Sequence, residues 1–422
     1  QMCIRDRNGG ESMDIFGILS MIGGLALFLY GMEAMGAGLS KLSGGRMERL
    51  LEKLTSKRIM AVLLGAGVTA VIQSSSATTV MVVGFVNSGI MKLNQAVGII
   101  MGANIGTTIT SWLLSLTGIQ GSSFILKMLK PSSFSPILAI VGIIFIMFTK
   151  DEKKKDIGGI FLGFAILMYG MEAMSGAVAP LADNEKFTGI LTMFSNPILG
   201  LLAGTILTAV IQSSSASVGI LQALCATGAV NFSTALPIIM GQNIGTCVTA
   251  IISSIGTSKN AKRAAAVHLF FNISGTVIFM VVFYTLNTFV HFSFLNTAAS
   301  PAGIAVIHSL FNIGATILLF PFANLLEKMA ILAIPDKGSE VEEMEEEKIN
   351  PDLARLDERF LDKPGFAMEE CRGVAINMAR KSKKAMNLAI DLLKEYDEKT
   401  SARVEKLENQ IDQYEDCLLY KS

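Results

Sequence analysis

Charged residues are scarce in this chain, and those it has are confined to short runs. Of its 422 residues, only 17% are Asp, Glu, Lys or Arg, whereas 51% are hydrophobic. The mean hydropathy is +0.52. A soluble protein of this length spreads its charges along the chain, but here long uncharged stretches separate the charged runs. The pattern predicts a polytopic membrane protein embedded in a lipid bilayer.

Other absences exclude several classes of function. The formal net charge is zero and no basic face recurs, so nucleic acid is not expected as a partner. The five cysteines lack paired spacing, which argues against a disulfide framework and against a zinc site. No nucleophile–base pair, metal-ligand cluster or Walker-type loop is evident in the sequence. We therefore expect neither an enzyme nor ATP coupling, and no cofactor.

An internal duplication organises the apolar part of the chain. The string from Thr69 to Ala77 recurs letter for letter from Thr208 to Ala216, and the offset is 212 − 73 = 139 residues. Two further pairs keep this offset, namely 30–35 with 169–174 and 102–107 with 241–246. Three matches in one register predict two structural repeats. Such repeats are typical of secondary transporters, whose binding site lies between them.

The membrane topology follows from the length and charge of the segments. Segments 59–87 and 197–229 each carry Gln-Ser-Ser-Ser at their centre. The stretch from Ile59 to Ile72 would span roughly 21 Å as a helix, which is short of a hydrocarbon core of about 30 Å. We predict that both segments are re-entrant hairpins, although a single crossing by each is the alternative. Seven further segments are predicted crossings: 15–40, 95–117, 134–149, 157–179, 235–256, 264–290 and 302–330.

Loop charges favour the hairpins, because the lysine-rich loops then share the cytoplasmic side. Each repeat then crosses the membrane an odd number of times, so the second copy is inverted, the N terminus lies outside and the C terminus inside. The expected fold is all-α. Its predicted divisions are a non-native or disordered start (1–12), two membrane repeats (13–150 and 151–290), an additional transmembrane helix (291–335), an acidic linker (336–352) and a cytoplasmic, incomplete helical domain (353–422).

The duplicated Gln-Ser-Ser-Ser motif carries the predicted binding site. Serines compete for backbone partners and are poor in a helix interior, so each motif predicts a broken helix. At membrane depth a break is tolerated where it is buried in protein or lines a cavity. The half-helices restarting near Ser76 and Ser215 would offer N–H groups to an anion, and the preceding carbonyls would hold a cation. A serine-rich packing interface is the alternative.

Other polar residues in the apolar segments are weaker candidates. We predict second helix breaks at Asn104–Thr107 and Asn243–Thr246, where Asn, Gly and Thr can end and cap half-helices. In the alternative interpretation the glycine allows close helix approach and the asparagine bonds to a neighbouring helix. Intramembrane Glu33 and Glu172 are candidate cation ligands. The alternative is that each caps a hairpin or extends its carboxylate to the membrane surface. The His268–Asn272 and His308–Asn312 pairs favour interhelical hydrogen bonds over proton coupling.

Taken together, these motifs resemble the bacterial sodium-dependent phosphate cotransporter family (type II Na⁺/Pi cotransporters) from Met13 to about Leu419. The resemblance implies a secondary transporter that couples Na⁺ to inorganic phosphate by alternating access in the cytoplasmic membrane. It also implies a PhoU-like tail. The helices of this tail would either join copies of the chain in a homo-oligomer or bind a phosphate-regulatory protein. Alternatives are a membrane phosphate sensor, an anion channel and a transporter of another small oxyanion.

The resemblance also assigns ligands to the candidate residues. Electrogenic relatives use an additional intramembrane Asp for an extra Na⁺, and no Asp lies inside a predicted span here. The expected phosphate ligands are Gln73, Ser74, Ser75, Ser76, Gln212, Ser213, Ser214, Ser215, Asn104 and Asn243. The expected Na⁺ ligands are Gln73, Ser75, Thr107, Gln212, Ser214 and Thr246.

Overall fold

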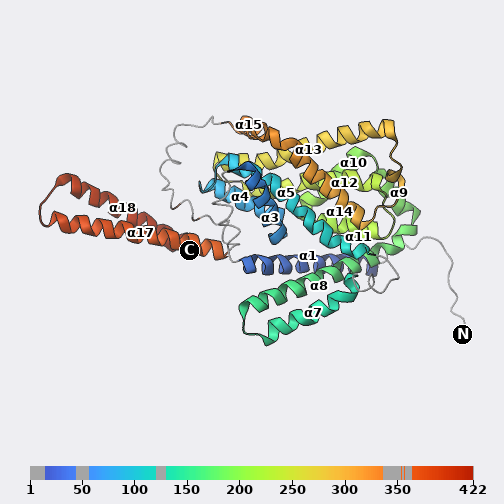
Figure 1. Ribbon diagram of the computed structural model, residues 1–422, viewed down its shortest axis with the longest axis horizontal. Coiled ribbons are helices and arrows are strands. Elements are labelled where there is room, and N and C mark those ends of the chain that lie inside the picture. The colour runs from blue at the N-terminus through green and yellow to red at the C-terminus, as the bar shows by residue number, and fades with distance from the viewer. Residues whose placement is uncertain are drawn as a thin grey trace.

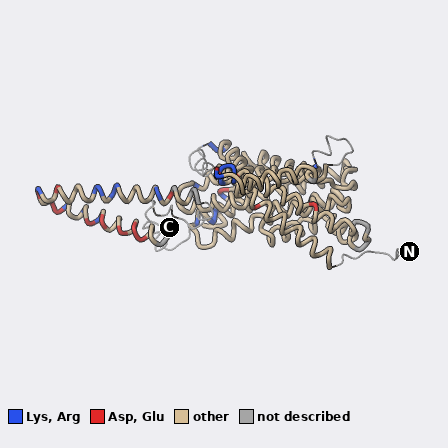
Figure 2. Tube along the Cα trace, turned by 90° about the horizontal axis from the view of Figure 1, so that it is seen from below, with Lys and Arg blue, Asp and Glu red and all other residues tan. Residues whose placement is uncertain are grey.

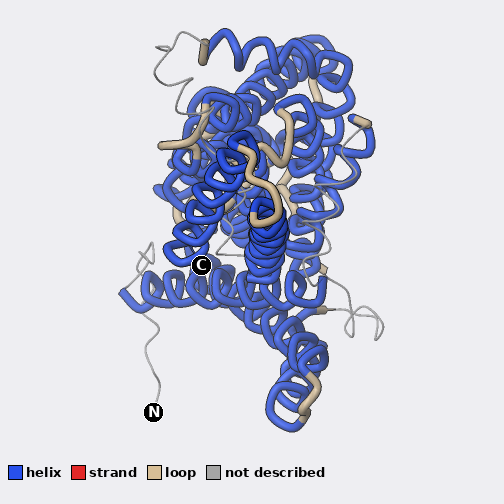
Figure 3. Tube along the Cα trace, turned by 90° about the vertical axis from the view of Figure 1, so that its left-hand side faces the viewer, coloured by secondary structure: helices blue, strands red, loops and turns tan. Residues whose placement is uncertain are grey.

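The computed structural model describes residues 15–43, 57–119, 130–335 and 364–421, together with Leu353 and Leu356. Helices joined by short connections make up these residues, apart from one isolated β-bridge between Asn231 and Ala298 (Figure 3). The predicted all-α fold is therefore confirmed. The predicted start (1–12) and acidic linker (336–352) lie outside the described residues.

The helices follow the two halves of the duplication (Figure 1). The first half contains α1 (Ile15–Ser43), α3 (Arg58–Ile72), α4 (Ser75–Asn87), α5 (Leu93–Ser115) and α7 (Pro131–Phe148). The second half contains α8 (Glu152–Val178), α9 (Glu185–Met193), α10 (Pro197–Ile211), α11 (Ser214–Ala226), α12 (Phe232–Ser253) and α13 (Lys259–Val290). After them come α14 (Pro301–Leu319), α15 (Ala323–Ala333), α17 (Pro364–Leu392) and α18 (Glu398–Lys421).

Six described helices are long and apolar enough to cross a membrane. They are α1, α5, α8, α12, α13 and the helix formed by α14 with α15, and they coincide with six of the seven predicted crossings. The seventh, 134–149, is α7, a shorter apolar helix. The chain is thus a polytopic α-helical membrane protein.

The first helices of the two halves, α1 and α8, pack against each other along most of their length (Figure 1). A Cβ added at Gly31 would lie 2.6 Å from the carbonyl oxygen of Gly163, and one added at Gly170 would lie 2.6 Å from that of Gly24. Residue numbers on α1 rise as those on α8 fall, so the helices are antiparallel. The offset of 139 converts one contact into the other. The pair is therefore related by an approximate two-fold rotation, and glycines let the backbones approach closely.

Helices α3 and α5 run parallel, although only α4 lies between them in the sequence. A Cβ added at Gly98 would lie 3.0 Å from the carbonyl oxygen of Arg58, and one at Gly106 would lie 2.5 Å from that of Ala66. Because the numbers rise together, α4 must run back in the opposite direction, and α3 and α4 form a hairpin.

The second half repeats this arrangement. A Cβ added at Gly200 would lie 2.7 Å from the Pro237 ring, and one at Gly245 would lie 2.5 Å from the carbonyl oxygen of Thr205. Helices α10 and α12 are therefore parallel, and α11 folds back against α10. The short helix α9 precedes α10 with a bend of 103° between them.

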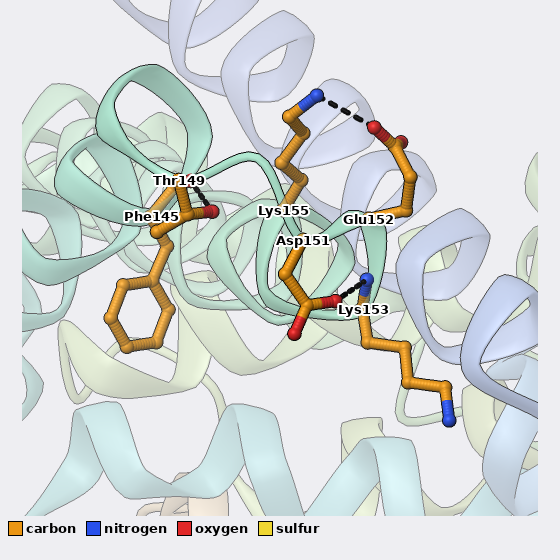
Figure 4. Close-up of polar contacts among 6 residues, drawn as sticks. All are labelled: Phe145, Thr149, Asp151, Glu152, Lys153 and Lys155. Atoms are coloured by element: carbon orange, nitrogen blue, oxygen red, sulfur yellow. Dashed lines mark hydrogen bonds and ion pairs between the residues drawn. The ribbon is translucent and has the colours of Figure 1, made fainter.

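Charged residues gather at one end of the helical bundle and on the hairpin of α17 and α18, which projects from it (Figure 2). In this hairpin Lys381 donates to Gln410 at 2.8 Å and lies 5.5 Å from the centre of the Tyr414 ring. Figure 4 shows the polar contacts of the lysine-rich turn between α7 and α8. Asp151 caps α8 by accepting from the Lys153 amide at 3.0 Å, and Lys155 pairs with Glu152 at 2.7 Å.

Candidate functional site

Each Gln-Ser-Ser-Ser motif breaks a helix, as predicted. Helix α3 ends in Gln73 at φ 61°, ψ 22°, and α10 ends in Gln212 at φ 58°, ψ 20°. This left-handed conformation costs an ordinary residue roughly 1–2 kcal/mol. Among the described non-glycine residues, positive φ is found at these two glutamines and at His291. Because the same strained conformation recurs at equivalent positions, the break is a shared structural feature of both halves.

The serine after each glutamine caps the next half-helix. Ser74 Oγ accepts from the Ala77 amide at 3.1 Å, and Ser213 Oγ accepts from the Ala216 amide at 3.2 Å. Helices α4 and α11 therefore begin at Ser75 and Ser214, one residue earlier than predicted. The remaining N–H groups of each first turn have no partner within the helix, and they carry the positive end of the helix dipole.

The two helix starts meet. Ser75 Oγ lies 3.5 Å from Ser214 Oγ, and these two residues are equivalent by the offset of 139. Their exposed fractions are 4% and 5%. A second contact joins the halves, because Ser76 Oγ donates to the carbonyl oxygen of Gln212 at 3.5 Å. Two helix N-termini thus converge on a buried cluster of hydroxyls, which suits an anion.

Two threonines that the sequence analysis missed hold this cluster. Thr110 Oγ1, on α5, donates to Gln73 Oε1 at 2.9 Å, while Gln73 Nε2 donates to the Ala70 carbonyl. Thr249, on α12, donates instead to the main-chain oxygen of Gln212 at 3.4 Å. The signal that could have identified them is the duplication itself, because Thr110 and Thr249 are also separated by 139 residues.

The predicted second breaks are wrong. Helix α5 continues through Asn104 and α12 continues through Asn243. Each asparagine donates back to the carbonyl four residues earlier in its own helix, Asn104 to Ile100 at 3.0 Å and Asn243 to Ile239 at 2.9 Å. The amide is satisfied without a break, and the neighbouring glycine serves close packing on α3 or α10.

The threonines of these segments behave in the same way. Thr107 donates to the Ala103 carbonyl at 3.1 Å and Thr246 donates to the Gln242 carbonyl at 2.9 Å. No hydrogen bond within the described residues joins the four Asn and Thr side chains to the Gln-Ser-Ser-Ser cluster. Ser215 is buried next to Ser214 on α11.

The other candidates lie outside the cluster's hydrogen bonds. Glu33 and Glu172 are both exposed. Asn272 bonds across to α12, donating to Cys247 Sγ at 3.3 Å, whereas Asn312 donates within its own helix to the His308 carbonyl at 2.9 Å. The expected interhelical bonding is therefore seen at the first His-x-x-x-Asn pair. His268 is buried, and neither of its ring nitrogens has a partner among the described residues.

These features define a polytopic membrane protein in which two broken helices meet at a buried polar cluster, an arrangement found in secondary transporters. The profile of the Na⁺/Pi-cotransporter family matches the chain twice, over residues 27–176 and 166–300. The chain belongs to this family. The two matches begin 166 − 27 = 139 residues apart, which is the offset of the duplication.

Several relatives resemble the chain. YqeW of Bacillus subtilis (strain 168) is 29% identical over 322 residues, which cover 76% of this chain and 99% of that protein. The "Putative inorganic phosphate export protein YjbB" of Salmonella typhimurium is 27% identical over 323 residues, 76% of this chain and 56% of its own length. "Sodium-dependent phosphate transport protein 2A" of Rattus norvegicus is 39% identical over 113 residues, 25% of this chain and 17% of its own length. The chain therefore spans about half of the YjbB relative. No solved structure gives a significant match.

Proposed function

We propose that the chain is a secondary active transporter that couples Na⁺ to the movement of inorganic phosphate by alternating access in the cytoplasmic membrane. Family membership supports phosphate transport. The observation that carries the proposal is the meeting of Ser75 with Ser214 at 3.5 Å, at the N-termini of α4 and α11. A phosphate placed there would accept from serine hydroxyls and from the amides of two first helical turns.

The ligands of this site contain no fixed positive charge. Burying a divalent anion without compensation would cost many kcal/mol, so co-bound Na⁺ is the simplest source of the missing charge. Gln73, Gln212, Ser75 and Ser214 offer oxygens for it, and we add Thr110 and Thr249 to this set. Because α5 and α12 are continuous and these side chains bond within their own helices, we propose that four residues support the site without contacting the ligand: Asn104, Asn243, Thr107 and Thr246.

We further propose that the two halves are inverted repeats with re-entrant hairpins. The antiparallel packing of α1 on α8 supports this, as do the folded-back pairs α3–α4 and α10–α11. The hairpins would then enter from opposite sides, with the N terminus outside and the C terminus inside.

Side-specific labelling tests this topology in a variant from which the five native cysteines are removed. Ile90→Cys and Ala229→Cys lie at equivalent positions after the two hairpins and are partly exposed. The first should react from the cytoplasm and the second from outside. Labelling of both from one side would rule out the inversion.

Radiolabelled phosphate uptake into proteoliposomes tests the function itself. Uptake should require a Na⁺ gradient and should fail with K⁺ or choline. Excess sulfate should compete weakly and arsenate strongly, because arsenate shares the charge and the tetrahedral OH groups of phosphate. Phosphate movement without any Na⁺ dependence would contradict cotransport. Because YjbB carries the name of an exporter, efflux from loaded vesicles is measured as well.

The hairpin of α17 and α18 lies where a PhoU-like cytoplasmic domain is predicted. We propose that it contacts a second copy of the chain or a phosphate-regulatory protein.

A further inference from the structure

A cavity of about 520 Å³ lies where the two halves meet at one end of the bundle. We call it the junction cavity. Its walls come from the segment after α5, the end of α11, the start of α7 and the C-terminal part of α8. Its polar lining consists of Thr117, Lys130, Ser135, Tyr169, Glu172 and Ser175. None of these residues takes part in the hydrogen bonds of the Gln-Ser-Ser-Ser cluster, so the cavity is a separate feature.

The polar groups of the junction cavity are not satisfied by one another. Ser135 has an exposed fraction of 1%, and its Oγ has no partner in the part of the chain that the structure describes. A buried hydroxyl without a hydrogen-bond partner is rare in proteins unless a ligand or a water molecule supplies that partner. Lys130 and Glu172 line the same space, yet no ion pair within 4 Å joins them among the described residues.

We propose that the junction cavity is a second binding site, for a phosphate group that is accompanied by a positive charge. The ammonium of Lys130 and the hydroxyl of Ser135 are donors suited to phosphate oxygens, whereas the Thr117 hydroxyl already donates to the Leu114 carbonyl at 2.8 Å. Glu172 would repel a lone phosphate, so the ligand must bring a cationic part to that wall. A free phosphate ion with its Na⁺ has this chemistry, and so does the head group of phosphatidylethanolamine.

The equivalent positions at the opposite junction of the molecule are joined by a hydrogen bond. The offset of 139 relates Ile119 to Ser258 and Ala226 to Asn87. Ile119 and Ala226 line the cavity, whereas the amide of Ser258 donates to Asn87 Oδ1 at 2.9 Å. The junction cavity lies at the end of the bundle that contains Ile119 and Ala226.

Equilibrium binding to the purified full chain tests the site, with radiolabelled inorganic phosphate and Na⁺ as the first probe. Wild-type protein should bind two phosphates per chain. Lys130→Gln should weaken one of them by on the order of tenfold, which corresponds to the loss of one charge-assisted hydrogen bond. Ser135→Ala should weaken the same phosphate by a smaller factor, and Gln73→Glu should remove only the other. Lys153→Gln, an exposed lysine at the far end of α8, is the control and should change neither.

Native mass spectrometry with phosphatidylethanolamine is the second arm. If wild type binds one free phosphate and Lys130→Gln loses a bound lipid, the ligand is the lipid head group. Glu172→Gln should then lose the preference for phosphatidylethanolamine over phosphatidylglycerol.

The proposal would be overturned if Lys130→Gln bound phosphate and phosphatidylethanolamine as Lys153→Gln does. Failure of Na⁺-driven uptake is a separate result, because neither binding arm requires transport.

Discussion

The two Gln-Ser-Ser-Ser turns have one sequence and one backbone, but their glutamine side chains are in different states. Gln73 is buried and held by Thr110 at 2.9 Å. Gln212 is exposed, and the equivalent Thr249 contacts its main-chain oxygen at 3.4 Å instead. The backbone angles agree within 3°. The turn is therefore set locally by the motif, whereas the position of the amide depends on the surrounding helices.

The hydroxyl residues that precede and follow each turn also differ in their hydrogen bonds between the two halves. Thr69 donates to Thr78 at 3.0 Å in the first half. Their equivalents in the second half, Thr208 and Ser217, are buried without partners among the described residues. If the proposed alternating access by inverted repeats holds, we expect the two halves to exchange such states during the cycle. The first half would then be in its tightly held form and the second half in its released form.

The largest effect is expected from a charge at the held glutamine. Gln73→Glu removes the donor to the Ala70 carbonyl and buries a carboxylate, so phosphate uptake should fall on the order of a hundredfold. Gln212→Glu places its charge at an exposed position and should reduce uptake less. Uptake in proteoliposomes, normalised to folded protein by size-exclusion chromatography, measures both. Wild-type uptake in both variants would make the motif a packing element.

A smaller effect is expected from the glycines that bring the parallel helices together. Gly106→Ala and Gly245→Ala each place a Cβ about 2.5 Å from a carbonyl oxygen of the facing helix. Each should destabilise the protein by about 1–3 kcal/mol, because backbone cannot move aside as a side chain can. Thermal unfolding in detergent measures the loss. Gly67→Ala, where nothing lies within 4 Å, is the control. Stability equal to this control in either variant would contradict the parallel packing in that half.

The smallest effect, and the sharpest test of the comparison, comes from the threonines. Thr110→Val removes the hydrogen bond to the Gln73 side chain, which is worth about 0.5–1.5 kcal/mol, and should lower uptake by up to about tenfold. Thr249→Val removes a long contact to main chain and should lower it by less. Uptake is measured as above. Equal losses would indicate that both glutamines are held alike during most of the cycle.

Part of the fold and part of the candidate site could be predicted from the sequence. The breaks at Gln73 and Gln212 follow from serine chemistry and from the letter-for-letter duplication, so local physics was sufficient. The second breaks at Asn104 and Asn243 were predicted wrongly, because an asparagine can cap a new helix or bond back within a continuous one. The facing helix decides between these outcomes, since Gly106 and Gly245 pack closely only on a regular helix. The different states of Gln73 and Gln212 could not be predicted, because the motifs are identical.

Phosphate binding measured at several Na⁺ concentrations tests the central claim most directly. The purified chain is titrated with phosphate while K⁺ or choline replaces Na⁺ at constant ionic strength. Because the cluster lacks a fixed positive charge, phosphate affinity should rise as Na⁺ rises. By linkage, phosphate should raise the affinity for Na⁺ by the same factor. A phosphate affinity at the Gln-Ser-Ser-Ser cluster that is independent of Na⁺ would contradict the account.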